Sequence, residues 1–337
     1  MASNLADPSR SRGRALIIGV NGQDGSYMAE HLLGDGWDVV GIARQAQARH
    51  VHSSPRFRYF HLDLNTDREA LAGLLRETKP DRIHHVAAVH GAAGFVYEDH
   101  WQAALDVNVG SVHTCLEFIR NESPETRLLY ASSLKVFGAK PPPIIHEGLP
   151  RFSTCLYSIT KNAAEELIDY YRTHHGVRAT VLYLLNHESP RRPAHFFLPR
   201  VTGLLANALA KTRGKPLSAD KTPDLSPLYG LDFTCDWGSS AEYMALGAAL
   251  LEADENQDYV MATGRSWTGL EFTSALFDLA GLDWREHVEV MSEPDGSLEP
   301  SYRADIGRMV EVLGAGPKQS ALDVAKWILA ETYGLPL

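Results

Sequence analysis

A tyrosine and a lysine four residues apart carry the clearest chemical signal in this sequence. Tyr157 and Lys161 lie in CLYSITKNAAEE, a helical pattern that places both side chains on one helix face. A neighbouring ammonium, together with a positively charged nicotinamide ring, lowers the pKa of a phenol, which then removes a hydroxyl proton while hydride leaves the same carbon. Ser133, which ends an earlier apolar run, is expected to hydrogen-bond the reacting oxygen. These residues predict oxidation of an alcohol by a nicotinamide cofactor, and the alternative is a surface Tyr-Lys pair.

Three glycines near the start of the chain predict where the cofactor binds. Gly19, Gly22 and Gly25 lie between an apolar run and a helical pattern. Glycines there let the backbone turn tightly and approach a pyrophosphate, whose charge meets the N–H groups at the helix N-terminus. The alternative is an ordinary turn between a strand and a helix. The spacing G-x-x-G-x-x-G is typical of short-chain dehydrogenases.

Residues after the next two predicted strands are expected to contact the adenosine half of the cofactor. Arg44 ends the strand predicted at 37–44, where no carboxylate is available for the ribose, so NADP is slightly favoured over NAD. An exposed surface arginine is the alternative. Asp63, near the end of the strand predicted at 58–65, either accepts from the adenine amino group or caps a helix. The predicted cofactor set further includes Gln23, Asp24, Leu64, Ala87 and Ala88.

Strand-like runs alternate with helical patterns through the first half of the chain. The runs lie at 14–20, 37–44, 58–65, 81–89, 126–133 and 178–186. This alternation predicts an α/β fold with a Rossmann-type doubly wound parallel sheet. We expect a disordered tail over 1–13 and an NAD(P)-binding domain over 14–190, with a strand at 258–264 interleaved into it. Residues 191–337, with long Pro- and Gly-rich loops, are expected to form a smaller substrate-binding region.

Composition excludes several classes of function. The chain has 337 residues and a net charge of −10, which argues against nucleic acid and anionic membranes as partners. Cys115, Cys155 and Cys235 lie far apart, so they predict no disulfide framework and no zinc site, and they suit a reducing cytosol. No run approaches the roughly 18 apolar residues of a membrane span. We therefore expect a cytoplasmic enzyme that holds no metal.

Four segments together resemble the family of GDP-mannose 4,6-dehydratase, within the extended short-chain dehydrogenases. They are GVNGQDGSYMAEHLL (19–33), LYLLNHESPRR (182–192), DWGSSAEY (236–243) and DYVMATG (258–264). The most specific is NHESPRR, and the resemblance covers residues 14 to 281. It implies NADP or NAD at the glycine turn and a nucleotide-diphosphate sugar, expected to be GDP-linked, as substrate. It also implies a homodimer or homotetramer.

The same resemblance implies roles for residues after the last predicted strand of the first half. Asn186 is expected to contact the sugar nucleotide, and His187 and Arg192 to face the cofactor. Two adjacent arginines after a proline also suit phosphate groups, which they bind by charge-assisted hydrogen bonds. A solvated surface pair is the alternative. The predicted substrate set is His90, Ser133, Asn186, Arg192, Arg200 and Arg303.

Lys135 stands where the resemblance predicts a glutamate. In the dehydratases that glutamate takes the C5 proton of the sugar and helps the C6 hydroxyl leave as water. With Lys135 in its place and Leu134 before it, we expect C4 oxidation without elimination, so the main prediction is a 4-epimerase. The alternatives are a GDP-sugar 4,6-dehydratase with Lys135 as base, a C4 dehydrogenase, and a surface lysine without a chemical role. An alternative of another class is a non-catalytic protein that binds sugar nucleotides.

Overall fold

The computed structural model describes residues 11–51, 54–91, 95–253, 256–291 and 302–337, so most of the predicted tail lies outside the described residues. The chain divides into two compact units. The first unit runs to Gly138 and adds Pro150–Tyr183 and Met244–Tyr259. The second unit comprises Ala139–Leu149, Leu184–Tyr243 and Val260–Leu337.

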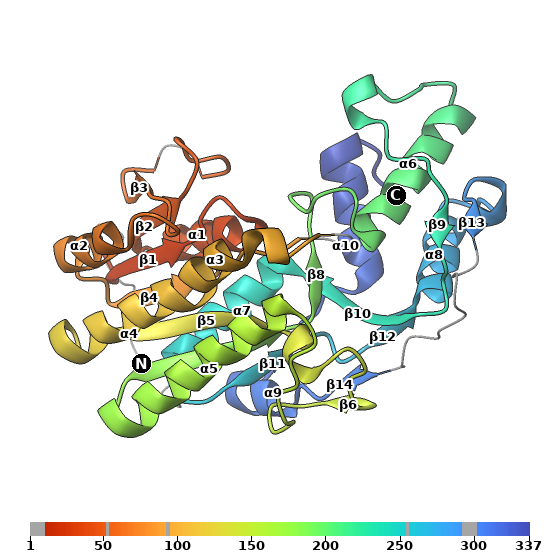
Figure 1. Cartoon of the computed structure of the whole chain (residues 1–337). Helices are drawn as coiled ribbons and strands as arrows, with labels where there is room; N and C mark the ends of the chain where they lie inside the picture. The colour runs from red at the N-terminus through yellow and green to blue at the C-terminus, as the bar shows by residue number, and fades with distance from the viewer. Residues whose placement is uncertain (1–10, 52–53, 92–94, 254–255, 292–301) are drawn as a thin grey trace, which may run out of the picture. The chain divides into compact units, whose positions relative to one another are not determined.

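A seven-stranded, mostly parallel sheet organises the first unit (Figure 1). Its order is β11-β7-β5-β4-β1-β2-β3, so the chain winds outward in both directions from β1 and β4. The strands are β1 (Arg14–Ile18), β2 (Asp38–Ala43), β3 (Phe57–His61), β4 (Arg82–His85), β5 (Arg127–Ser133), β7 (Arg178–Leu184) and β11 (Tyr259–Met261). The apolar residues of β1, such as Leu16 and Ile17, are fully buried, as expected for a parallel sheet covered on both faces. The predicted Rossmann-type fold is confirmed.

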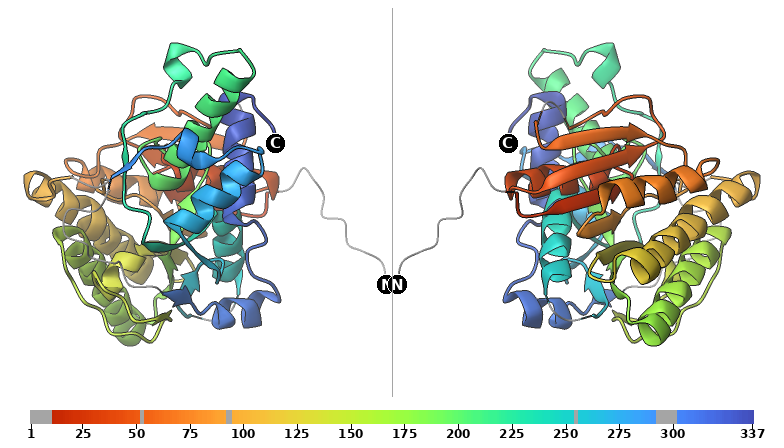
Figure 2. Two further views of the ribbon diagram at one scale, coloured as in Figure 1. Left: turned by 90° about the vertical axis from the view of Figure 1, so that its right-hand side faces the viewer. Right: turned by 90° about the vertical axis from the view of Figure 1, so that its left-hand side faces the viewer.

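Helices connect these strands. They are α1 (Gln23–Gly34), α2 (Arg68–Thr78), α3 (Trp101–Leu105), α4 (Ser111–Glu122), α5 (Leu156–His175) and α7 (Ser240–Glu252). Helices α2, α4 and α5 pack side by side (Figure 2). Helix α5 begins after Cys155, where the Ser158 hydroxyl accepts from the Cys155 amide at 3.1 Å, and it ends at Gly176, whose φ is +65°. Tyr157 and Lys161 therefore both lie on α5.

The second unit is built on a three-stranded sheet of order β12-β10-β8. Its strands are β6 (Ile144–Ile145), β8 (Asn186–Glu188), β9 (Leu228–Tyr229), β10 (Thr234–Ser239), β12 (Ser266–Thr268), β13 (Val290–Met291) and β14 (Arg303–Ala304). Its helices are α6 (Phe197–Thr212), α8 (Gly269–Asp278), α9 (Gly307–Leu313) and α10 (Ala321–Ile328). Apolar side chains of α6, α8 and α10 pack with Trp237 of β10 to form its core. The sequence predicted β11 but none of the other strands after residue 186. Those strands were missed because they are short and partly polar.

Candidate active site

The glycine turn after β1 has the shape that a pyrophosphate requires. Gly19 has a φ of +98°, and a Cβ there would lie 2.9 Å from the backbone of Ala87. A Cβ on Gly25 would collide with the carbonyl oxygen of Gly19. Gly22 is the exposed N-cap of α1, and no side chain caps the helix there. This geometry fits a dinucleotide phosphate at the helix N-terminus.

Replacing Gly22 with valine is expected to abolish binding of NADP and NAD while the protein stays folded. The nearest atom to a Cβ on Gly22 is the oxygen of Gly19 at 3.3 Å, so the new side chain projects mainly into the space for the pyrophosphate. Calorimetric titration with each cofactor measures the loss, and a melting curve checks the fold. Gly34→Val is the matched control, because a Cβ there meets nothing within 4 Å at the other end of α1. Unchanged affinity in Gly22→Val would contradict this cofactor site.

The segment after β2 is held in place by two side chains of the first unit. The Asn21 amide donates to the carbonyl oxygen of Gln47 at 2.9 Å, and the Tyr59 hydroxyl donates to that of Ala43 at 3.2 Å. The side chain of Arg44 is exposed beside this anchored segment. No carboxylate lies between Arg44 and His50. We therefore still expect the site for the adenosine ribose to accept a 2′-phosphate, as in NADP.

Asp63 does not cap α2, which corrects one of its two predicted roles. The N-cap of α2 is Asp67, whereas Asp63 Oδ1 accepts from the amide of Asn65 at 3.0 Å in the turn before the helix. Leu64 beside it is buried. Ala87 and Ala88 follow β4, and Ala87 lies against Gly19 as described above. The contact of Asp63 with adenine therefore stays a prediction.

Ser133, Tyr157 and Lys161 come together between the end of β5 and the start of α5. The hydroxyls of Ser133 and Tyr157 are hydrogen-bonded to each other. Lys161 Nζ donates to the carbonyl oxygen of Ala131 at 2.6 Å, and its side chain is only 2% exposed. The exposed His90 ring lies over Tyr157 with ring centres 4.6 Å apart. The phenol of Tyr157, the hydroxyl of Ser133 and the ammonium of Lys161 thus lie close together.

The protein side chains by themselves do not lower the pKa of Tyr157, so the predicted lowering, which also requires the nicotinamide ring, stays a prediction. Burial raises the pKa of this phenol, and the hydrogen bond with Ser133 only partly opposes that effect. Lys161 Nζ lies 5.8 Å from the ring centre of Tyr157 and closer, at 4.6 Å, to that of Tyr130. Burial lowers the pKa of Lys161 to about 7, against the opposing charges of Glu165 and Asp24.

The sequence reasoning missed two residues of this region. Tyr97 bonds His90 Nδ1 through its hydroxyl at 2.8 Å and stacks on Tyr157 with ring centres 5.9 Å apart. Asn108 is fully buried, accepts from the amide of Val89 at 2.8 Å and donates to Thr160 Oγ1 at 2.9 Å. The only sequence signal for Asn108 is an amide in DVNVG, which forms a π-helical turn before α4.

Lys135 lies in a short 3₁₀ turn, Leu134–Phe137, that directly follows β5. Its backbone N–H donates to Ser133 Oγ at 3.3 Å, so the turn is tied to the hydroxyl that bonds Tyr157. The Lys135 side chain is exposed. Its position is consistent both with a chemical role beside Ser133 and with a plain surface charge.

The predicted residues of the second unit differ in their surroundings. His187 Nδ1 bonds the carbonyl oxygen of Leu185 at 2.6 Å, while Asn186 beside it on β8 is exposed. Arg192 pairs with the buried Glu188 at 3.1 Å, and its guanidinium lies 3.5 Å from the ring centre of Phe196. Glu188 thus holds the arginine that was predicted to face the cofactor.

No described contact joins Arg200 or Arg303 to the predicted site residues Asn186, His187 and Arg192. Arg200 Nη2 donates to the carbonyl oxygen of Ser226 at 2.6 Å and ties α6 to the segment before β9. Arg303 is exposed on β14, where its amide donates to the carbonyl oxygen of Pro143 at 2.9 Å. Their contacts with a substrate therefore remain predictions.

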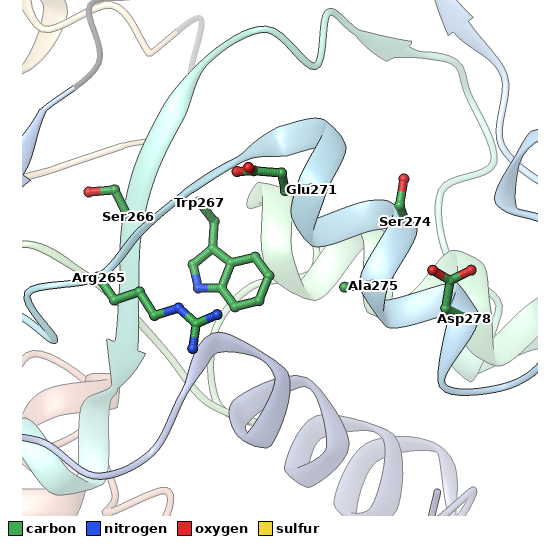
Figure 3. A pocket seen from close by; sticks show the side chains of 7 residues that line it. All are labelled: Arg265, Ser266, Trp267, Glu271, Ser274, Ala275 and Asp278. Carbon is green, nitrogen blue, oxygen red and sulfur yellow. The ribbon is translucent and has the colours of Figure 1, made fainter.

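A hollow of about 380 Å³ lies on the second unit beside β12 and α8 (Figure 3). The guanidinium of Arg265 stacks over Trp267 at 4.6 Å from its ring centre. None of the predicted site residues lines this hollow, whose walls are Arg265, Ser266, Trp267, Glu271, Ser274, Ala275 and Asp278. Within the described residues, no cluster of His, Cys, Asp or Glu is arranged to hold a metal ion. In the same part of the chain, no helix is long and apolar enough to cross a membrane.

Comparison with known proteins agrees with this geometry. The model of the GDP-mannose 4,6 dehydratase family matches residues 16–312. GDP-mannose 4,6 dehydratase 1 of Arabidopsis thaliana is 29% identical over 98% of this chain and 92% of its own length. GDP-mannose 4,6-dehydratase of Vibrio cholerae is 32% identical over 77% of this chain and 70% of its own.

Among solved structures, that of dTDP-glucose 4,6-dehydratase from Bacillus anthracis in complex with NAD has the same fold. Its TM-score is 0.75 at 17% identity, and the match covers 94% of this chain and 97% of that one. The fold and the match along most of the chain agree. The chain therefore belongs to the GDP-mannose 4,6 dehydratase family, whose members are NAD(P)-dependent nucleotide-sugar enzymes of the extended short-chain dehydrogenases.

Proposed function

We propose that this protein is a 4,6-dehydratase of a GDP-linked hexose that uses NADP in preference to NAD. The observation that carries the proposal is the hydrogen-bonded pair of Ser133 and Tyr157, with Lys161 buried one helical turn further on. The relatives that match along most of the chain are GDP-mannose 4,6-dehydratases, which supports elimination over the 4-epimerisation expected from Lys135. The preference for NADP rests on Arg44 at the end of β2, where no acidic side chain follows.

The first step oxidises C4 of the sugar. Tyr157 Oη takes the proton of the C4 hydroxyl, while Ser133 Oγ bonds the same oxygen and orients it. A nicotinamide cofactor held at the glycine turn Gly19–Gly25 would supply the hydride acceptor for C4. We expect the Lys161 ammonium, 5.8 Å from the centre of the Tyr157 ring, to favour the phenolate by its charge. The product of this step is a 4-keto sugar.

The second step removes water, and here Lys135 takes the place of the usual carboxylate. A C4 ketone makes the C5 hydrogen acidic, so the amine of Lys135 can remove that proton and pass it to the C6 hydroxyl, which leaves as water. Tyr157 can then give C5 the proton that it took from the C4 hydroxyl, while C6 would gain the hydride taken from C4. The cofactor is unchanged over the cycle, and the net reaction is the loss of one water molecule from the sugar.

A 4-epimerase is the second candidate, and the exposure of Lys135 favours it. In that reaction hydride returns to the opposite face of C4, and Lys135 has no chemical role. The other predicted alternatives are net oxidation at C4 and binding without chemistry.

Product mass after incubation with a panel of GDP-hexoses and NADP tests these possibilities. We expect a product lighter than its substrate by one water. A product of equal mass that NMR shows to be inverted at C4 would contradict elimination and support an epimerase. A product lighter by two hydrogens, with stoichiometric reduced cofactor, would indicate a C4 dehydrogenase. Recovery of every sugar nucleotide unchanged by mass and NMR would indicate a binding protein. The expected homodimer or homotetramer and the cytoplasmic location stay predictions.

A further inference from the structure

Three consecutive residues at the end of β5 are each bonded to a different turn of α5. The α5 partners are spaced by four residues, so they lie on one face of the helix. The three bonded pairs are Ser133 with Tyr157, Ala131 with Lys161, and Ser132 with Glu165. The proposed chemistry uses Ser133, Tyr157 and Lys161 but assigns nothing to Ser132 and Glu165.

Glu165 is a buried carboxylate whose two oxygens have different partners. Its side chain is 6% exposed; Oε1 accepts from Ser132 Oγ, and Oε2 accepts from Arg151 Nε at 2.8 Å. The guanidinium of Arg151 lies beside the rings of Phe137 and Tyr183, 4.9 and 4.4 Å from their centres, and it also donates to the Tyr183 hydroxyl. A buried charge with hydrogen-bonded partners on both sides is held in one geometry, because breaking either contact leaves it unpaired.

We propose that Glu165 is a positioning residue, which through Ser132 fixes the alignment of β5 with α5 so that Ser133 and Tyr157 meet at one substrate oxygen. Ser132 and Ser133 are joined by one planar peptide unit, so anchoring Ser132 limits the positions that Ser133 can take. A displacement of about 1 Å at a reacting centre costs on the order of 100-fold in rate. The inference rests on the proposed function, because the oxygen in question is the C4 hydroxyl of the sugar.

The charge of Glu165 has a second consequence for the same group of residues. It lies one turn from the buried Lys161 and opposes the effect of burial by raising the pKa of that ammonium. Without the carboxylate, Lys161 loses its proton at a lower pH. A residue that stabilised the fold without placing a charge near Lys161 would leave this titration unchanged.

Glu165→Gln tests the proposal, with Glu166→Gln as matched control on the exposed side of α5. We expect kcat of Glu165→Gln to fall about 10- to 100-fold, with KM for the sugar nucleotide nearly unchanged. We also expect the alkaline limb of its kcat–pH profile to move to lower pH. Ser132→Ala removes only one hydroxyl and keeps the Glu165–Arg151 pair, so we expect a smaller loss of kcat. This variant tests the proposal even if Glu165→Gln folds poorly.

The proposal is overturned if Glu165→Gln and Ser132→Ala both keep the kcat and pH profile of Glu166→Gln. It is also overturned if the loss of activity equals the loss of folded protein in a melting curve. A wild-type protein without turnover on any sugar nucleotide would contradict the proposed function instead. In that case crystal structures of the two variants decide: a kept Ser133–Tyr157 hydrogen bond contradicts the positioning role, and a broken one supports it.

Discussion

Tyr157→Phe is expected to lower kcat by about 100- to 10,000-fold, the range that general acid–base groups contribute. The substitution removes one oxygen, the atom that takes the C4 proton in the proposed reaction. The ring is 6% exposed and stacks with His90 and Tyr97, so phenylalanine keeps its packing. Loss of activity with a nearly unchanged melting curve therefore reports on the chemistry.

Steady-state assays and mass spectrometry of the product measure this effect. Tyr170→Phe is the matched control, because Tyr170 lies on the same helix and is 52% exposed. Binding of the sugar nucleotide to Tyr157→Phe, followed by calorimetry, should stay within a few-fold of wild type, since the ring remains. If Tyr157→Phe retained most of its turnover, the proton of the C4 hydroxyl would have to leave by another route, and the proposed role of Tyr157 would be wrong.

Lys135→Ala is expected to separate the two steps of the proposed reaction. Oxidation of C4 should persist, because Ser133, Tyr157 and Lys161 are untouched and the Lys135 contact with Ser133 uses only the backbone N–H. Elimination should slow about 100- to 10,000-fold, since the base that removes the C5 proton is gone. Reduced cofactor should then accumulate, and its absorbance measures the first step without the second.

Two further variants sharpen this result. Lys140→Ala changes another exposed lysine five residues later and should leave both steps intact. Lys135→Glu supplies a carboxylate at the position in question and should dehydrate faster than Lys135→Ala. Dehydration by Lys135→Ala at the wild-type rate would exclude Lys135 as the base and leave it a surface charge.

Local patterns predicted the strands and helices that carry the first unit. Apolar runs such as the one that forms β1 need burial on both sides, which only a covered parallel sheet provides. The glycine turn was predictable for a similar reason, since Gly19 takes a φ that other residues avoid. In the second unit, strand β8 consists of the polar residues Asn186–Glu188 and exists because it pairs with Trp237–Ser239 of β10. Such pairing joins segments some fifty residues apart and leaves no local signal.

The same distinction between local patterns and long-range contacts applies to the candidate site. The sequence by itself determined that Tyr157 and Lys161 share a helix face, because an i,i+4 spacing is a property of the helix alone. Only the tertiary structure decided how deeply they are buried, and burial sets the direction in which their pKa values move. The tertiary structure alone also brought Glu165 to Ser132, which lies 33 residues earlier in the chain. Contacts of that kind depend on how a strand and a helix pack, and no spacing in the sequence encodes them.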